Sequence, residues 1–247
     1  KRWYKGNLHS HTYWSDGSAF PEQAIAWYRS HGYNFYGMSD HNIFQDDPQR
    51  WRAVAVGKRA VKKSIFEAYV RDFPDAETRT AKDGSTEVRL KTYAELRRKF
   101  DVPGEFLLLP AVEVTHNTRL ASGVIHQVHM NTVNIPDVPP SRRAKNFSSR
   151  FNNKPVAELI GEKAREAKEQ AARLGVPHLF ILNHPIWRWY DVVPEELIAN
   201  PDVRFFEVCN NGSPFGPGEG LPTDGLDTDR FWDIVNAFRA ARGQKLL

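Results

Sequence analysis

Segments with the pattern of β-strands alternate with segments that have the pattern of α-helices, and this alternation constrains the fold more than any other feature. The strand-like segments are 3–12, 34–42, 105–115, 124–135, 177–185 and 203–212. The helix-like segments are 21–32, 48–73, 91–100, 155–175 and 226–243, and residues 74–90 form a polar insertion that is partly loop. Such alternation predicts parallel βαβ units. We therefore expect one α/β domain over residues 1–247, a common length for an α/β barrel.

Composition excludes several classes of protein. No run of about 18 apolar residues is present, so the sequence predicts no membrane span. The net charge is +4 and the Lys and Arg residues are spread along the chain, so we expect no nucleic-acid partner. The single cysteine, Cys209, rules out an internal disulfide, and its apolar run "RFFEVCNNG" predicts that it is buried.

Histidine or glutamate occurs near the predicted carboxyl end of five strands, where parallel barrels carry their functional residues. These candidates are His9 and His11 in the first strand, His41, Glu113, His129 and His184. His9 and His11 have the same parity along their strand, whereas His126 has the opposite parity to His129. Imidazole and carboxylate together suit Zn²⁺, Mn²⁺ or Fe²⁺. Asp16 in "SDG" could instead be an Asx-turn residue, and Asp40 has the parity of a supporting or capping group rather than a ligand.

Five short motifs, "HSHTYWSDG", "SDHN", "AVEVT", "HQVHMN" and "LNHP", resemble in this order the PHP (polymerase and histidinol phosphatase) domain. The resemblance covers nearly the whole chain and implies a distorted (β/α)7 barrel. It implies one PHP-type metallohydrolase domain over 1–247, of the stand-alone kind. Many such proteins are exported, so a periplasmic or secreted location is expected, with a cytoplasmic one as the alternative.

The resemblance also implies two or three divalent transition-metal ions. By position, the ligand sets are His9, His11 and Glu113 for the first ion, Glu113, His129 and His184 for the second, and Asp16 with His41 for the third. The family has a final motif, an Asp followed by a His on the seventh strand, that this sequence lacks. We expect that the chain ends before that strand; the alternative is an incomplete third site.

The activity implied is that of a metal-dependent phosphoesterase, in which a metal-bridging hydroxide attacks the phosphorus of a small-molecule ester. Candidate catalytic residues are Asp16, Asp40 and Glu113, and candidate substrate-binding residues are Arg119, Arg188 and Trp187. Some relatives hydrolyse carboxylic or carbamate esters, so this reaction at the same metals is an alternative. A degenerate, non-catalytic PHP scaffold is another. The sequence leaves the substrate and the oligomeric state open.

Overall fold

The computed structural model describes residues 2–57, 59–119, 125–137, 151–152, 154–186, 192–210 and 227–247. Contacts between residues divide the chain into two compact units, Lys1–Val112 and Glu113–Leu247. The boundary between them falls inside one long strand, β6 (Leu107–Arg119). That the whole chain acts as a single domain stays a prediction.

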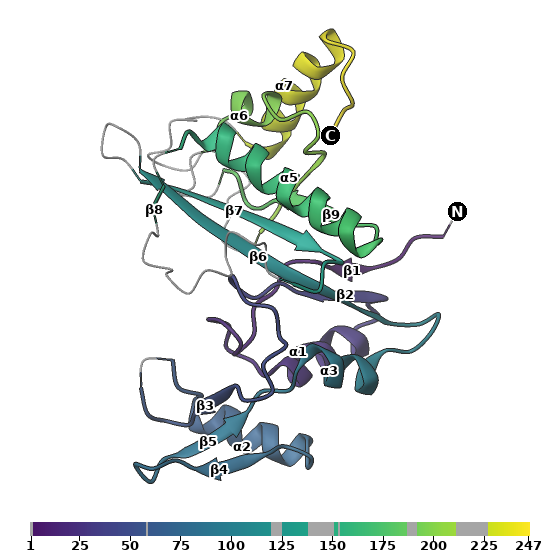
Figure 1. Ribbon diagram of the computed structural model, residues 1–247. Helices are drawn as coiled ribbons and strands as arrows, with labels where there is room; N and C mark the ends of the chain where they lie inside the picture. The colour runs from purple at the N-terminus through teal and green to yellow at the C-terminus, as the bar shows by residue number, and fades with distance from the viewer. Residues whose placement is uncertain are drawn as a thin grey trace. The chain divides into compact units, whose positions relative to one another are not determined.

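The first unit contains one part of a seven-stranded sheet and a separate three-stranded sheet (Figure 1). Its elements are β1 (Gly6–Asn7), α1 (Pro21–Ser30), β2 (Phe35–Met38), β3 (Trp51–Ala53), α2 (Lys63–Asp72), β4 (Thr78–Thr80), β5 (Thr86–Arg89), α3 (Tyr93–Phe100) and the start of β6. Strand β2 pairs in parallel with β1 on one side and with β6 on the other. Strands β3, β5 and β4 form an antiparallel sheet of their own.

The second unit is built on a sheet that mixes strand directions. Its elements are the rest of β6, β7 (Ile125–Val133), β8 (Phe151–Asn152), α5 (Val156–Leu174), β9 (Leu179–Leu182), α6 (Pro194–Ile198), β10 (Phe205–Phe206) and α7 (Thr228–Ala241). Strand β7 pairs antiparallel with β9, and β9 pairs in parallel with β10. Helix α5 packs against β7 (Figure 1). Among the helices described, none is both long enough and apolar enough to cross a membrane.

Local sequence signals explain where the helices begin and end. Helix α1 starts at Pro21, whose fixed φ suits a first helical position. Helix α3 starts after Thr92, which accepts a hydrogen bond from the backbone N–H of Glu95 in a capping box. Helix α5 ends at Gly175, which has a left-handed φ of 66°. The structure thus confirms the helices predicted in 21–32, 91–100 and 155–175.

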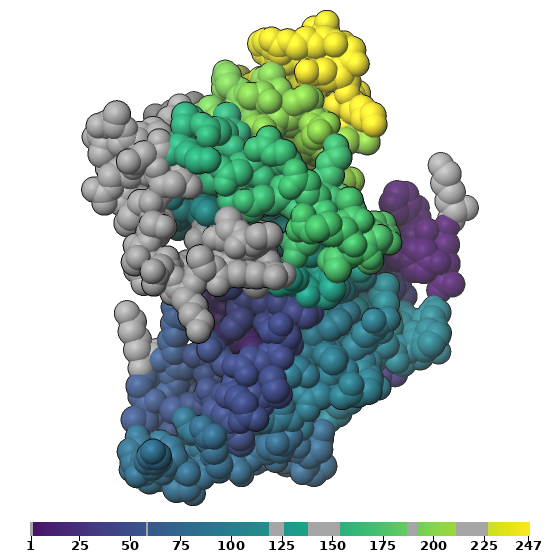
Figure 2. Space-filling view, in the orientation of Figure 1, coloured from purple at the N-terminus to yellow at the C-terminus, as the bar shows by residue number. Residues whose placement is uncertain are grey.

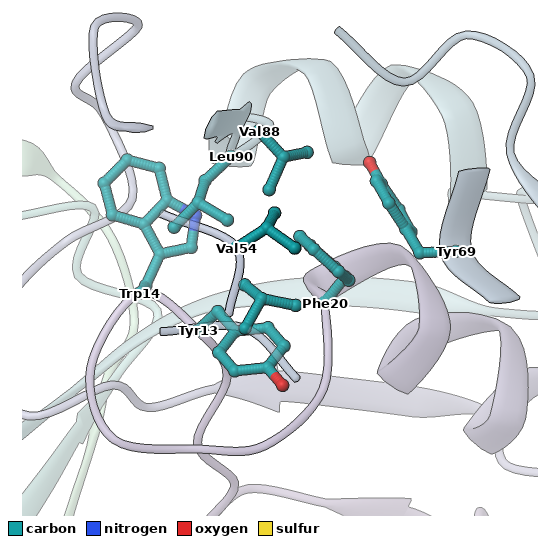
Figure 3. Packing of buried hydrophobic residues seen from close by; sticks show 8 residues of the cluster. Tyr13, Trp14, Phe20, Val54, Tyr69, Val88 and Leu90 are labelled. Carbon is teal, nitrogen blue, oxygen red and sulfur yellow. The ribbon is translucent and has the colours of Figure 1, made fainter. Parts of the chain in front are cut away.

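A buried aromatic cluster forms the core of the first unit (Figure 3). The Phe20 ring stacks on the Tyr69 ring with 3.8 Å between centroids, and the Tyr13 ring meets Phe20 edge-on at 5.0 Å. Trp14 is fully buried, and its indole N–H donates to the Lys91 carbonyl. Truncating such a buried aromatic side chain typically costs about 3–5 kcal/mol. Tyr13 and Trp14 therefore anchor the segment that connects the first predicted motif to α1.

The predicted (β/α)7 barrel is wrong. A barrel of this kind needs parallel strands joined by helical crossovers, but β7 and β9 run antiparallel. Strands β6 and β7 are neighbours in the sheet, and five residues separate them in sequence. A parallel crossover needs about a dozen residues or more. Alternating strand and helix patterns do not report strand direction, and this is why the sequence misled.

The predicted helix over 48–73 is wrong in its first half. Residues Trp51–Ala53 form β3, and the helix begins only at Lys63. Ala55 and Gly57 have positive φ angles of 63° and 101°, which a right-handed helix cannot contain. The polar insertion that follows, expected to be partly loop, supplies strands β4 and β5.

Cys209 is exposed, so its predicted burial is also wrong. The apolar run around it was interpreted as a buried strand. The strand found there, β10, is only two residues long, and Phe205 and Val208 are themselves about half exposed. An apolar run at the end of a sheet is not sufficient evidence of burial.

Candidate metal centres

Three histidines and an aspartate gather in the first unit, in a group that we call the imidazole cluster: His9, His11, Asp16 and His41. The Nε2 atoms of His9 and His11 are 3.2 Å apart. Asp16 lies 3.5 Å from Nδ1 of His11 and 3.6 Å from Nε2 of His41. One ligand atom from each of His11, Asp16 and His41 lies within 4.8 Å of the other two, which meets the requirement for a metal-binding group.

The imidazole cluster is carried by loops rather than by strands. Strand β1 ends at Asn7 and β2 at Met38, so His9, His11 and His41 all follow strand ends. Two hydrogen bonds to Ser10 hold the loop that carries His9 and His11. Tyr36 donates from its hydroxyl to Ser10 Oγ at 2.8 Å, and the Ser39 backbone N–H donates to the Ser10 carbonyl at 2.9 Å.

Asp40 organises the loop that presents Asp16. Its carboxylate is fully buried and accepts from the backbone N–H and the hydroxyl of Thr12, at 2.8 and 2.9 Å. It also accepts from the backbone N–H and the hydroxyl of Ser15, at 3.1 and 2.7 Å, and from the amide of Gln45 at 3.0 Å. A buried charge is tolerated when it is saturated with hydrogen bonds in this way. These contacts suit a positioning role; a catalytic role for Asp40 stays a prediction.

Arg52 secures the same loop from the side of strand β3. Its guanidinium donates to the Tyr13 carbonyl and, at 2.7 Å, to the Ser15 carbonyl. Burial, followed by the charge of Arg50, lowers the pKa of Arg52. The antiparallel sheet of β3, β5 and β4, which was not predicted from the sequence, thus helps to fix the loop that carries Asp16.

The second unit has its own group, the carboxylate cluster of Glu113, His129 and His184. Glu113 is fully buried, with its Oε1 atom 3.1 Å from Nδ1 of His129 and 3.5 Å from Nε2 of His184. The rings of His129 and His184 meet at 65°, with 5.3 Å between centroids. One carboxylate oxygen therefore faces an imidazole nitrogen from strand β7 and another from the segment that follows β9.

Two side chains that the sequence analysis did not single out support the carboxylate cluster. The Asn183 amide donates to Oε1 of Glu113 and to Oδ1 of Asn131, both at 2.9 Å. Glu207 follows β10 and accepts from the backbone N–H of His184 at 3.0 Å. Asn183 could have been found from its place beside His184 in "LNHP", whereas Glu207 carries no motif.

His184 has a strained backbone. Its φ is 27°, in the left-handed region that a residue with a side chain rarely adopts. Such strain costs on the order of 1–3 kcal/mol and persists only where the surroundings impose it. The hydrogen bond from the His184 backbone to Glu207 helps to hold this conformation, in which the imidazole of His184 points at Glu113.

The donor spacing in the imidazole cluster fits a metal ion, and in the carboxylate cluster Oε1 of Glu113 lies at ligand spacing from one nitrogen of each histidine. Nitrogen and oxygen ligands about 2.0–2.1 Å from a tetrahedral Zn²⁺ lie ~3.3 Å from one another. The separations are 3.2, 3.5 and 3.6 Å in the imidazole cluster and 3.1 and 3.5 Å in the carboxylate cluster. Imidazole and carboxylate are ligands for Zn²⁺, Mn²⁺ and Fe²⁺ alike. The chain can therefore hold divalent ions, and their identity and number are left to the proposal below.

The structure changes the expected placement of most ligands, because β1, β2 and β9 end before the histidines that were expected within them. Glu113 was expected at the end of a strand but lies in the middle of β6, which continues to Arg119. His126, of opposite parity to His129, belongs to none of the metal-binding groups among the described residues. Of the substrate-binding candidates, Arg119 ends β6 but its side chain lies outside the described part, and Trp187 and Arg188 lie outside the described residues altogether.

Comparisons with known proteins give little guidance. No protein-family model and no curated protein matches the chain. One solved structure from Bifidobacterium adolescentis, named a "putative metal-dependent phosphoesterase", aligns over 97% of this chain and 84% of its own, with 13% identity and a TM-score of 0.44. A similarity this low carries no argument about fold or function, so the function has to be argued from the two clusters.

Proposed function

We propose that this protein is a metal-dependent phosphoesterase that hydrolyses a small-molecule phosphate ester. The observation that carries the proposal is the gathering of imidazole and carboxylate atoms at ligand spacing, once within each unit. The resemblance of the five motifs to the PHP family supplies the reaction class. Membership of that family, and export from the cytoplasm, remain predictions.

Each cluster has a distinct part in the proposal. His9, His11, Asp16 and His41 would hold metal in the first unit, and Glu113, His129 and His184 in the second. When bound, divalent ions lower the pKa of water toward neutrality and stabilise charge on a phosphoryl oxygen. Asn183 keeps Oε1 of Glu113 directed at the imidazoles through its 2.9 Å hydrogen bond. That Glu113 also binds an ion held by His9 and His11 is implied by the resemblance and remains a prediction.

Asp16 is better placed than Asp40 to take part in the chemistry. The Asp16 side chain is 52% exposed, so solvent and substrate can reach it. Both oxygens of Asp40 are occupied as acceptors from Thr12 and Ser15, so this carboxylate is committed to holding the loop. We therefore assign Asp40 to holding the loop and Asp16 to the chemistry.

A substrate panel tests the proposal. The purified protein, loaded in turn with Zn²⁺, Mn²⁺ and Fe²⁺, is assayed on aryl phosphate monoesters, aryl phosphate diesters and matched aryl carboxylic and carbamate esters. We expect hydrolysis of a phosphate ester that is lost on chelation and recovered on adding metal back. Turnover of carboxylic or carbamate esters alone would assign the chain to the other hydrolase class. Bound metal with no turnover on the whole panel would contradict enzymatic function.

A further inference from the structure

A second site lies in the second unit, at the other end of strand β9 from His184. It is a groove of about 630 Å³ between α5, the start of β9 and the segment that follows α6. His178, which precedes β9, lines it, whereas His184 follows the last residue of β9. The four residues of β9 separate the two ends by about 13 Å. The groove is therefore distinct from the carboxylate cluster.

The groove is lined by an excess of cations. Four of its side chains carry a positive charge and one carries a negative charge: Arg165, Lys168, Arg204 and Lys245 against Asp202. Asp202 lies 3.5 Å from Lys168, and both side chains are largely exposed, so this pair contributes little. Among the described residues, no carboxylate pairs with the other three cations. The positive charge of the groove is consequently left largely uncompensated.

A buried guanidinium adds to this charge. Arg239 is fully buried, and its Nη2 atom donates to the carbonyls of two groove residues, Asn200 at 3.0 Å and Val203 at 2.9 Å. Its Nε and Nη1 atoms have no hydrogen-bond partner within the described part of the chain. Burial lowers the pKa of Arg239, and the charge of Arg204 lowers it further. A buried cation without a counter-ion is costly, and an anion bound nearby would offset that cost.

The remaining lining is apolar and held in place. Phe180 is buried, and Phe205 is 49% exposed, so one aromatic ring is available at the surface. Arg204 donates from Nε to the Leu246 carbonyl at 3.1 Å, which fixes the segment carrying Lys245. Figure 2 shows α5 and the segment 192–210 side by side on the visible face, and α5 packs against α6. A volume of this size is typical of pockets for small organic molecules.

We propose that this groove binds a small phosphate-bearing organic anion with a flat aromatic part, such as a nucleoside diphosphate. The arginines match phosphate oxygens in two-point hydrogen bonding, and the lysines add charge. Phe205 offers a face on which a ring can stack. The cations converge on one hollow instead of following a line across the surface, which favours a compact ligand over a nucleic-acid strand.

The test is calorimetric titration of the whole chain with ADP and with inorganic pyrophosphate, at low ionic strength and with chelator present. We expect saturable binding of both, weakened by added salt. Arg165→Glu should weaken the binding of both by at least about tenfold. Arg173→Glu, an exposed charge reversal on the same helix outside the groove, is the matched control and should change little. Phe205→Ala should weaken the binding of ADP and leave the binding of pyrophosphate unchanged.

Several outcomes would overturn the proposal. Absence of saturation up to ~10 mM of either probe would exclude a useful site. If Arg173→Glu weakened the binding of ADP and pyrophosphate as much as Arg165→Glu does, the effect would come from the overall charge of the protein and not from the groove. If Glu113→Gln abolished the binding of both probes, their binding site would be the carboxylate cluster and not the groove. Tight binding of a short single-stranded DNA without binding of ADP would replace the small molecule with a nucleic acid. None of these outcomes bears on hydrolysis, which is measured separately with metal present.

Discussion

The two clusters use the same ligand types in opposite settings. In the imidazole cluster the side chains stand on loops and are partly open to solvent, with 23% of His11, 27% of His41 and 52% of Asp16 exposed. In the carboxylate cluster they stand on or beside strands of the sheet and are closed off, with at most 5% of any side chain exposed. Without metal, water can solvate the side chains of the imidazole cluster, but it has little access to those of the carboxylate cluster.

This difference determines where each unit needs support. The carboxylate of Glu113 is buried in the sheet and depends on Asn183 and two histidines. In the first unit Asp40 is a buried carboxylate that belongs to none of the metal-binding groups found among the described residues and holds the loop through Thr12 and Ser15. A buried carboxylate is thus the proposed metal ligand in one unit and a scaffold in the other, so burial alone does not identify a catalytic acid.

The largest effect is expected from Glu113→Gln. The amide keeps the shape of the side chain but loses its charge, so metal held with His129 and His184 should be lost. Changes to groups that merely support metal ligands typically cost about 10–100-fold, and loss of a ligand should exceed this range. Metal content, circular dichroism and hydrolysis of an aryl phosphate are measured together. Asp16→Asn, in the open cluster, is the comparison and should cost less.

If Glu113→Gln kept its metal and near-normal turnover while remaining folded, the buried cluster would not be the main metal centre. If instead Asp16→Asn proved as damaging as Glu113→Gln, the contrast between an open and a closed cluster would have no functional meaning.

The second largest effect concerns metal release. Since the imidazole cluster is open and the carboxylate cluster is closed, chelator should remove metal in two phases. We expect the rates to differ by at least about tenfold, because a closed site must first open to admit solvent or chelator. The measurement uses a chromophoric chelator in excess. Asp16→Asn should remove the fast phase and leave the slow one, and a single phase in the native protein would contradict the prediction.

Asp40→Asn tests the scaffold role. An amide in this position cannot accept from all the donors of Thr12, Ser15 and Gln45, so some of them are left unsatisfied. We expect a loss of about 2–4 kcal/mol in the free energy of unfolding. Turnover should fall by roughly 10–100-fold through weaker metal binding at the imidazole cluster. Asp47→Asn, an exposed aspartate that accepts from the Gln49 backbone, is the control. If Asp40→Asn bound metal at the imidazole cluster as tightly as the native protein, Asp40 would not position that cluster.

The same contrast explains how much could be predicted from the sequence. Capped helices were predicted well, since Pro21 and Gly175 act locally. The resemblance paired Asp16 with His41, and the structure brings His11 to the same group, because loop residues that follow adjacent parallel strands meet at one edge. That these side chains bind metal remains a prediction.

Features set by pairing between distant strands could not be predicted. The antiparallel pairing of β7 with β9, and the sheet that brings Arg52 to the Ser15 carbonyl, leave no periodic signal. Glu113 was placed at a strand end because a charged residue after an apolar run usually marks one. In the structure β6 continues past it, since His129 and Asn183 allow a carboxylate inside a sheet.

The smallest effect is expected from Glu22→Gln, in the core of the first unit. Glu22 is buried beside Tyr69, whose hydroxyl donates to it at 2.7 Å, and burial raises the pKa of Glu22 above its usual value. A raised pKa in the folded state means that the contribution of Glu22 to stability is fully present below its unfolded pKa. That contribution is lost as the pH rises through the folded pKa.

Glutamine can accept the Tyr69 hydrogen bond without becoming charged, so Glu22→Gln should remove this loss. The variant should match the native protein near pH 4 and become more stable than it, by on the order of 1 kcal/mol, toward pH 8. Urea unfolding across that range measures the difference, with Glu67→Gln on the exposed face of α2 as the control. A variant that lost stability with rising pH as steeply as the native protein would show that Glu22 is already ionised and compensated. In that case the interior of the first unit would hold a second buried charge in addition to Asp40, and the contrast between the two units would be limited to the exposure of their metal ligands.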